Sequence, residues 1–208
     1  NLMEQFYQKD KIEVGIDEAG RGCLFGPVSV ASVIWSQTEP DPNIIIRDSK
    51  KMTERQKNIA YDYIMKNAIA VSHKFIHHDE IDKTNILKST IRGMHLCLDD
   101  ITKDHKIDTI LVDGNQFDFY CDCNDNYINH VCVVEGDNKY RSIACASVIA
   151  KVNRDNYIKK LCEENPELKE YDLHNNKGYG TARHLAAIKE KGITEWHRKT
   201  YGICKNYL

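Results

Sequence analysis

Long hydrophobic runs, internal repeats and low-complexity tracts are all missing from this sequence of 208 residues. No apolar stretch approaches the ~20 residues that a membrane-spanning helix requires. The first ten residues are polar and contain no apolar segment of the kind found in a secretory signal peptide. Proline is scarce, at four residues, and no segment has the composition of an interdomain linker. We therefore expect a protein that does not associate with membranes.

The eight cysteines are neither dense nor regularly spaced. Disulfide-stabilised domains are usually short secreted chains in which cysteines recur at close intervals. This chain is longer, and its cysteines do not follow that pattern. We therefore expect free thiols, a reducing compartment and a cytoplasmic location.

An excess of charge of one sign is also absent, because 29 Lys and Arg residues oppose 31 Asp and Glu residues. The balance differs along the chain: residues 138–208 contain 14 basic and 8 acidic residues (net +6), and residues 1–137 contain 15 and 23 (net −8). A basic C-terminal third beside an acidic remainder is compatible with a phosphate-binding surface next to a carboxylate-rich metal site. Ordinary solvated helices would give the same counts, so the asymmetry alone does not decide.

Apolar residues make up 41% of the chain and charged residues 29%, which suits one compact domain and excludes disorder. Runs of β-branched and apolar residues predict strands at 12–16, 28–34, 70–76, 109–112 and 131–134. Helical periodicity predicts helices at 53–68, 84–101, 142–161 and 181–191. Thr53 and Gln56 form a capping box at the first helix, and Gly192 ends the last. We expect an α/β fold, a mixed β-sheet flanked by helices, in a single domain spanning 1–208.

Carboxylates lie where three of the predicted strands end. Asp17 and Glu18 end the first strand, Asp113 ends a short buried strand, and Asp137 follows the last. If these strands are neighbours, the acids converge, and only bound cations would stabilise such a cluster near neutral pH. Each acid taken alone has a simpler interpretation, as a solvated strand end or an Asx turn. The pattern by itself leaves both interpretations open.

Several sequence blocks, in order along nearly the whole chain, closely resemble the ribonuclease HII family. They are VGIDEAGRG (14–22) with GPV (26–28), DSKK (48–51), VDGN (112–115), GD (136–137), ASVIAKV with RD (146–155), KGYGT (177–181) and HR (197–198). One short block would be weak support, whereas this ordered set is specific. The chain departs from the family pattern at Cys23, where proline is frequent, and at Phe25, where a small residue is usual. These changes affect packing near the expected site rather than its ligands.

The resemblance implies an endoribonuclease that hydrolyses the RNA strand of RNA–DNA hybrids, including ribonucleotides embedded in duplex DNA. It implies a ribonuclease H-like mixed sheet flanked by helices, with residues about 165–208 as a small C-terminal helical part that contacts substrate. Carried over position by position, it implies four catalytic, metal-binding carboxylates and one further acid beside the metal: Asp17, Glu18, Asp113, Asp137 and Asp155. It also implies a loop that reads the ribose 2′-hydroxyl, two phosphate-facing lysines and a sugar-packing tyrosine: Gly20, Arg21, Gly22, Lys50, Lys51 and Tyr179.

This chemistry explains why such residues are needed. Phosphodiester hydrolysis requires a nucleophile at neutral pH and neutralisation of the charge that builds on the leaving oxygen. Two Mg²⁺ or Mn²⁺ ions about 3.5–4 Å apart supply both, and carboxylates are the hard oxygen ligands that these ions prefer. Discrimination of RNA from DNA must rest on the 2′-hydroxyl. We expect these ions as cofactors, a hybrid or ribonucleotide-containing duplex as partner, and a monomeric enzyme.

Other functions fit parts of the same sequence. A junction- or DNA-specific nuclease on this fold also uses clustered acids, but it has no need of a ribose-reading loop at 20–22. A catalytically silent hybrid-binding protein would retain an unused cluster of mutually repelling carboxylates. Ribonuclease HIII usually carries an additional N-terminal substrate-binding domain, whereas about a dozen residues precede the first predicted strand here.

A second metal site is a weaker alternative. Zinc-ligand residue types gather at Cys121, Cys123, His130 and Cys132. Their spacing matches no common zinc-ligand pair, and Cys132 falls in an apolar strand. Buried or surface thiols are therefore the preferred interpretation.

Overall fold

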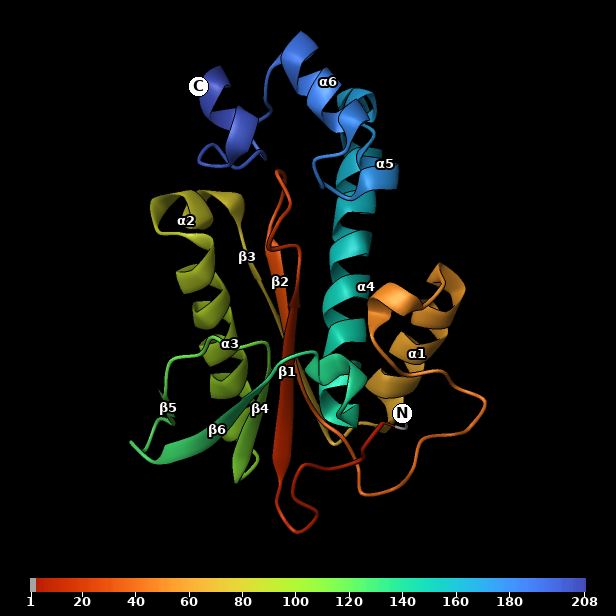
Figure 1. Ribbon diagram of the computed structural model, residues 1–208, viewed down its shortest axis with the longest axis vertical. Helices are drawn as coiled ribbons and strands as arrows, with labels where there is room; N and C mark the ends of the chain where they lie inside the picture. Colours follow the sequence, from red (N-terminus) through yellow and green to blue (C-terminus); the bar gives the residue numbers. More distant parts are fainter. Residues whose placement is uncertain (1–2) are drawn as a thin grey trace.

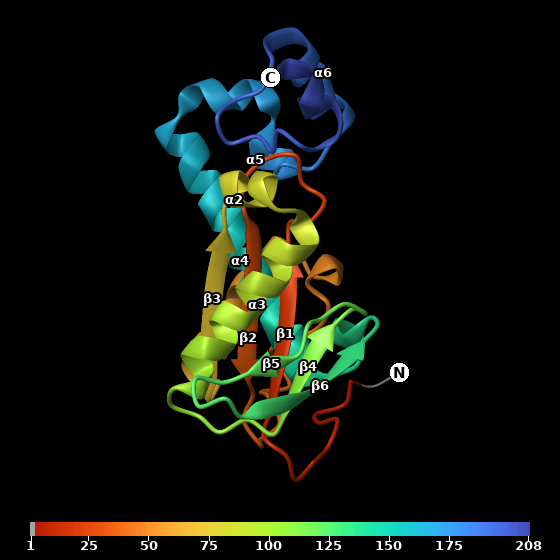
Figure 2. The same cartoon turned by 90° about the vertical axis from the view of Figure 1, so that its left-hand side faces the viewer.

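A computed structural model describes residues 3–208, so the first two residues of the expected single domain lie outside it. Its centre is a six-stranded sheet in the order β3-β2-β1-β4-β6-β5 (Figures 1 and 2). The strands are β1 (Glu13–Ala19), β2 (Val28–Ile34), β3 (Ala70–Ile76), β4 (Thr109–Asp113), β5 (Tyr120–Cys121) and β6 (Tyr127–Val133). β1, β2 and β3 pair antiparallel, β4 runs parallel to both β1 and β6, and β5 is antiparallel to β6. The expected mixed sheet is confirmed.

Helices cover both faces of this sheet. They are α1 (Glu54–Asn67), α2 (His78–Lys83), α3 (Ile86–Thr102), α4 (Arg141–Glu164), α5 (Leu173–Asn176) and α6 (Ala182–Lys191). Figure 1 places α3 on one face and α4, with α1 beside it, on the other. β2 is buried along its whole length because its alternating side chains contact both layers. Val30 and Ile34 join the core on the α3 side, and Ala31 and Val33 join the core on the α4 side.

The close approach of α4 to β1 depends on one glycine. Gly15 faces the first turn of α4, where an added Cβ atom would overlap with backbone atoms of Ser142 and Ile143. Alternate residues of a strand point to the same face. Asp17, two residues beyond Gly15, therefore lies on the α4 side of the sheet.

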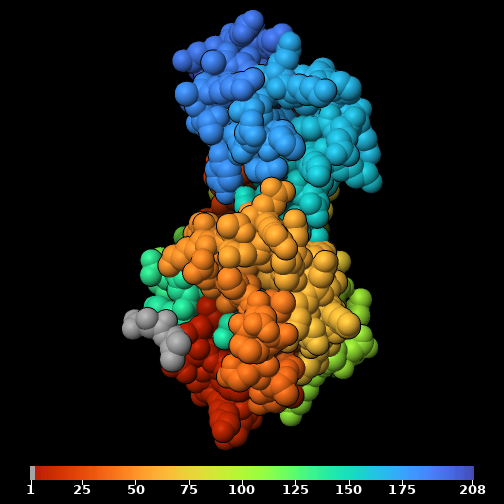
Figure 3. Space-filling model, turned by 90° about the vertical axis from the view of Figure 1, so that its right-hand side faces the viewer, coloured from red at the N-terminus to blue at the C-terminus, as the bar shows by residue number. Residues whose placement is uncertain are grey.

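The C-terminal residues form a small helical part at one end of the sheet (Figure 1) and make up the blue end of the molecule in Figure 3. Its core is built on Phe25, from the loop after β1, and includes Ile158, Leu168, Leu173 and Ile188. Two backbone hydrogen bonds tie it to the same loop: Leu24 N–H donates to Gly178 O at 2.8 Å, and Gly26 N–H donates to Trp196 O at 2.9 Å. The large residue at position 25 thus anchors this part to the sheet.

Most of the predicted elements are confirmed, and the differences have local causes. The predicted strands 28–34 and 70–76 coincide with β2 and β3, and the capping box of Thr53 and Gln56 is formed. The helix predicted at 84–101 starts only at residue 86, because the Asn85 side chain caps α3 by accepting the Lys88 N–H. β6 already begins at residue 127, before the predicted 131. Within residues 3–208, no helix has the length and apolar character needed to cross a membrane.

Candidate active site

The carboxylates of Asp17, Asp113 and Asp137 meet at the carboxyl ends of β1 and β4. Parallel pairing places Ile16 beside Val112, so Asp17 and Asp113 are the next residues of two adjacent strands. Asp137 lies in a 3-10 turn after β6, and its backbone N–H donates to Asp113 Oδ1 at 3.2 Å. Ligand oxygens of the three acids all lie within 4.8 Å of one another. The expected convergence of strand-end acids is confirmed for these three.

Glu18 lies outside that group of three but lines the same pocket. Its Oε1 forms an ion pair with Arg21 Nη1 at 3.7 Å. Its Oε2 is buried and has no hydrogen-bond partner in the part of the chain that the structure describes. A buried carboxylate oxygen without a donor is unfavourable unless a cation or a water molecule reaches it. This oxygen is therefore suited to a metal ion or a metal-bound water.

Burial raises the pKa of each acid in the pocket, and for Asp17, Glu18 and Asp137 the charges of the other acids raise it further. Desolvation, followed by the charges of the other acids, holds the pKa of Asp17 well above its usual value. Desolvation raises the pKa of Glu18 to about 7 against the opposing effect of Arg21. Desolvation and the Asp113 charge raise the pKa of Asp137 to about 7, and desolvation also raises the pKa of Asp113. Such a cluster is fully charged at neutral pH only beside cations, so the donors fit hard divalent ions.

The acids open into a pocket of about 460 Å³ that also contains most of the predicted substrate-contacting residues. Its lining includes the loop 20–22, Lys50 and Tyr179. Lys51 is not in the lining, and its Nζ donates to Asn138 Oδ1 at 3.2 Å. Partial burial by itself would lower the pKa of Lys50, but the surrounding carboxylates, of which Asp48 has the largest effect, together raise it. Of the two lysines, Lys50 is therefore the one that faces the acids.

Asp155 and Lys151, one turn apart on α4, differ in their relation to the pocket. Asp155 is not in the pocket lining, and its carboxylate pairs with Lys151 at 3.1 Å and with Lys57 at 3.6 Å. Lys151 does line the pocket, and its Nζ lies 5.7 Å from the centre of the Tyr179 ring. Lys151 was not predicted as a site residue from the sequence, although its i, i+4 spacing from Asp155 was a usable signal. The role of Asp155 at the metal stays a prediction.

The two glycines of the loop 20–22 serve different purposes. Gly20 has φ +90°, and a Cβ atom there would overlap with the Arg154 side chain, so the backbone itself requires glycine. A Cβ atom at Gly22 would meet nothing closer than Tyr179 Cε1, at 4.0 Å. Gly22 and Tyr179 therefore lie next to each other in the pocket wall, and a side chain at position 22 would contact the Tyr179 ring.

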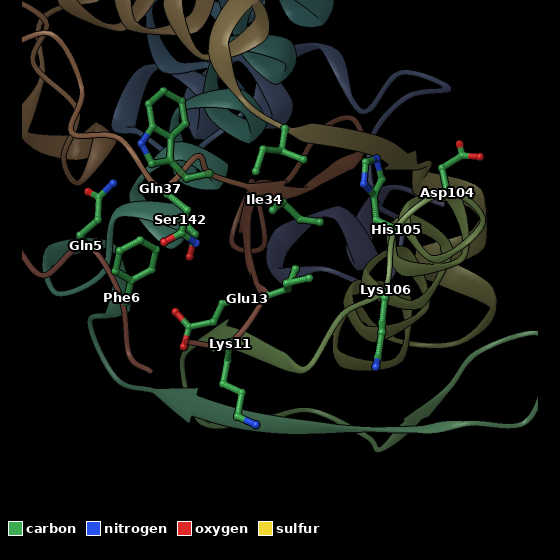
Figure 4. A pocket seen from close by; sticks show the side chains of 13 residues that line it. Gln5, Phe6, Lys11, Glu13, Ile34, Gln37, Asp104, His105, Lys106 and Ser142 are labelled. Atoms are coloured by element: carbon green, nitrogen blue, oxygen red, sulfur yellow. The ribbon is translucent and has the colours of Figure 1, made fainter. Parts of the chain in front are cut away.

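A second hollow, at the other end of β1, has no comparable chemistry. This cavity of about 230 Å³ is lined by side chains that include Phe6, Lys11, Glu13 and Lys106 (Figure 4). The buried carboxylate of Glu13 accepts the backbone N–H groups of Tyr7 at 3.0 Å and Gln8 at 2.6 Å. Glu13 thus anchors the N-terminal segment, and the hollow is not a candidate active site.

The zinc alternative gains no support from the fold. Among residues 3–208, the only side chains that group as metal ligands are Asp17, Asp113 and Asp137. Cys121 and Cys123 are exposed thiols. Thiols without a metal therefore remain the preferred interpretation of that segment.

Comparisons with known proteins give consistent matches. The sequence model of the family described as Ribonuclease HII matches residues 14–203. A protein named Ribonuclease HII from Bacteroides thetaiotaomicron is 42% identical over 202 residues, which cover 97% of this chain and 95% of that protein. The crystal structure of the ribonuclease H2 from Pyrococcus horikoshii matches with a TM-score of 0.75 at 20% identity, covering 94% of this chain and 96% of that one. Bst-RNase HIII in complex with Mn²⁺ matches with a TM-score of 0.69 at 18% identity, covering 95% of this chain and 68% of that one.

Proposed function

This chain belongs to the ribonuclease HII family, and we propose that Asp17, Glu18, Asp113 and Asp137 are its catalytic carboxylates. As a member of that family it is a metal-dependent endoribonuclease that cleaves RNA in RNA–DNA hybrids and at ribonucleotides embedded in DNA. One observation carries the residue assignment: oxygens of Asp17, Asp113 and Asp137 lie within 4.8 Å of one another, in the pocket that also contains the loop 20–22.

The proposed cofactors are two Mg²⁺ or Mn²⁺ ions. Asp17, Asp113 and Asp137 would hold them, and Glu18 would contribute its unpartnered Oε2. When bound, such ions activate water for attack and neutralise charge on the leaving 3′-oxygen. Asp155 is proposed at the edge of this site, where its contact with Lys151 supports a part in orienting that ammonium group. The Mn²⁺ complex of Bst-RNase HIII, which shares the fold, agrees with this choice of ion.

The substrate side of the site is proposed to consist of the loop 20–22, Lys50 and Tyr179. Lys50 lies among the acids and suits a phosphate group at the reacting position. Arg21, whose side chain is 39% exposed, suits the neighbouring phosphate through its fork of donors. Tyr179, a residue that is 41% exposed, would pack its ring on the deoxyribose that follows the last ribonucleotide. Through Tyr179, residues 165–208 would form the substrate-contacting part.

The expected setting of the protein is likewise a proposal. A hybrid duplex, or duplex DNA with embedded ribonucleotides, is the proposed partner, and the chain is proposed to act as a monomer. All eight cysteines, which lie in the described residues, are free thiols. Free thiols agree with the reducing cytoplasm as the location.

The test of the assignment is Asp113→Asn, which keeps the shape of the side chain but removes a charge that the cations need. Turnover of a duplex with one ribonucleotide should fall by orders of magnitude, and calorimetric Mn²⁺ binding should weaken, while the circular dichroism spectrum stays unchanged. Asp155→Asn is the control, because Asp155 lies outside the cluster, and its loss of turnover and of Mn²⁺ affinity should be smaller. Near wild-type cleavage by Asp113→Asn would remove Asp113 from the site.

A further inference from the structure

Arg198 is fully buried although it carries a charge. Its guanidinium donates to three backbone carbonyls of the loop that follows β1: Nη2 to Gly20 O at 2.7 Å, Nη1 to Arg21 O at 2.9 Å and Nε to Gly26 O at 2.9 Å. The Tyr201 hydroxyl also donates to Arg21 O, at 2.8 Å. A guanidinium that is enclosed and bound in this way cannot touch a substrate. Arg198 can therefore affect the reaction only through the position of this loop.

These hydrogen bonds fix the direction of two consecutive peptide groups. In a trans peptide the C=O and the following N–H point in opposite directions, and the described chain contains no cis peptide. Because the carbonyls of Gly20 and Arg21 point to Arg198, the N–H groups of Arg21 and Gly22 point to the opposite side. Neither N–H donates a hydrogen bond within residues 3–208, and residues 20–22 line the pocket of the acids. Two adjacent free amides aimed into a pocket form a site for an acceptor oxygen.

We propose that Arg198 is the positioning residue for sugar selectivity, because it aims the Arg21 and Gly22 N–H groups at the 2′-oxygen of the ribose. This proposal rests on the proposed function, and it adds that Arg198 sets the orientation of the loop 20–22. A lysine could not replace Arg198, since only a planar fork of N–H donors reaches three carbonyls at once. Specificity for the sugar therefore depends on Arg198, a residue of the C-terminal helical part.

Two constants distinguish a loss of sugar recognition from a general loss of folding or duplex binding. For wild type and Arg198→Lys we would measure kcat/KM on a duplex with one ribonucleotide, and the inhibition constant of an all-DNA duplex of the same sequence. Arg198→Lys should lower kcat/KM about tenfold or more, the size expected when a hydrogen bond to the substrate is lost. The inhibition constant of the DNA duplex should stay within about twofold of the wild-type value. The rise in melting temperature on adding Mn²⁺ should stay within about a degree of that of wild type. Neither quantity depends on the 2′-hydroxyl.

Two tyrosines offer a matched pair in case Arg198→Lys does not fold. Tyr201→Phe removes the second donor to the Arg21 carbonyl, whereas Tyr171→Phe removes a hydroxyl that donates to Gly192 O at 2.9 Å, away from the loop. Both changes remove one oxygen from a tyrosine of the C-terminal part. Tyr201→Phe should lower kcat/KM for the ribonucleotide substrate a few-fold, and Tyr171→Phe should leave it unchanged.

The outcomes distinguish this proposal from the function on which it rests. If Arg198→Lys folds and keeps wild-type kcat/KM, or weakens inhibition by the DNA duplex as much as it lowers kcat/KM, the positioning role is wrong. If Arg198→Lys does not fold, equal kcat/KM values for the two tyrosine variants overturn the proposal, and the predicted difference between them supports it. Cleavage of the all-DNA duplex by the wild-type enzyme would instead contradict the proposed function.

Discussion

At the scale of single residues, the charges of the clustered acids, which we propose to be catalytic, oppose folding. Desolvation, with added repulsion from neighbouring acids, raises the pKa values of Glu18 and Asp137 to about 7, and for Glu18 it does so against the opposing charge of Arg21. In an unfolded chain the same groups titrate near ~4. Between these values the folded state holds protons that the unfolded state has released. Without metal, the folded state therefore loses stability as the pH rises from about 4 to about 7.

Asp137→Asn tests this conflict, because an amide does not ionise. In EDTA, its melting temperature should fall less than that of wild type between about pH 5 and pH 8. Added Mn²⁺ should raise the melting temperature of wild type at pH 8 more than that of the variant, since the ion binds the folded cluster. The measurement is the thermal unfolding of both proteins at pH 5 and at pH 8, each in EDTA and in Mn²⁺. Parallel curves for the two proteins would show that Asp137 does not ionise within a buried cluster.

Tyr179 is the residue whose proposed role depends most on the kind of substrate. Tyr179→Ala should slow cleavage at a single embedded ribonucleotide more than cleavage of a long RNA tract, because only the former always presents a deoxyribose beyond the ribonucleotide. Stacking contacts of this kind contribute about 1–3 kcal/mol for bases, so a loss of tenfold or more is expected. Tyr179→Phe, which keeps the ring, is the control. An equal loss on both substrates would make Tyr179 a structural residue.

At this scale, the sequence predicts the position of a residue correctly where that residue follows a recognisable strand. Asp17, Asp113 and Asp137 could be grouped because each follows a recognisable strand, and the sheet order makes those strands neighbours. The choice of Lys50 over Lys51 depends on side-chain directions in one 3-10 turn, which no periodicity reveals. The position of Arg198 could not be predicted either, because its partners lie more than 170 residues away in the chain.

At the scale of elements, a buried histidine pair connects α6 to the loop of Tyr179. Thr194 N–H donates to His197 Nδ1 at 2.9 Å, so the proton of a neutral His197 ring lies on Nε2. That N–H donates to His184 Nε2 at 3.0 Å, and His184 Nδ1–H donates to the Tyr179 carbonyl at 2.9 Å. The chain of bonds requires both rings to be neutral. Burial lowers the pKa of His184 and lowers that of His197 to about 3.

This arrangement predicts acid sensitivity of the C-terminal part. Unfolded histidine titrates near ~6.5, so the stabilisation from a neutral pair is present above that pH and is lost progressively as the pH falls toward 3. His197→Gln keeps an N–H donor toward His184 but does not titrate in this range. The unfolding free energy of the variant should fall less than that of wild type between about pH 7 and pH 5, measured by urea denaturation. Equal decreases would mean that His197 does not account for the acid sensitivity.

The elements that sequence analysis missed are the short ones. α2, α5 and β5 have six, four and two residues, which is too few for a period to be recognised. The break between α2 and α3 depends on Asn85, whose side chain accepts the Lys88 N–H and so starts a new helix. Long elements with both faces buried or strongly amphipathic, such as β2 and α3, could be predicted because packing reinforces their pattern.

At the scale of the whole molecule, the pocket joins two parts with separate cores. The acids come from the sheet, and Tyr179 comes from the C-terminal helical part. Two buried arginines hold the loop between them: Arg198 binds the carbonyls of Gly20 and Arg21, and Arg154 binds those of Phe25, Pro27 and Lys177. These hydrogen bonds connect the acids proposed to bind metal with the residues proposed to read the sugar. On the proposed roles, we expect the fold to couple cleavage to recognition of the sugar.

The most direct test of this coupling compares two duplexes of the same sequence, one with a single ribonucleotide and one entirely of DNA. Each is incubated with the wild-type enzyme in Mg²⁺, in Mn²⁺ and in EDTA, and the cleavage sites are mapped on a sequencing gel. The account predicts cleavage at the ribonucleotide with either ion, none in EDTA, and none of the DNA duplex, since a site built to bind a hydroxyl rejects its absence by about 10⁴-fold. Cleavage in EDTA, or comparable cleavage of the DNA duplex, would contradict it.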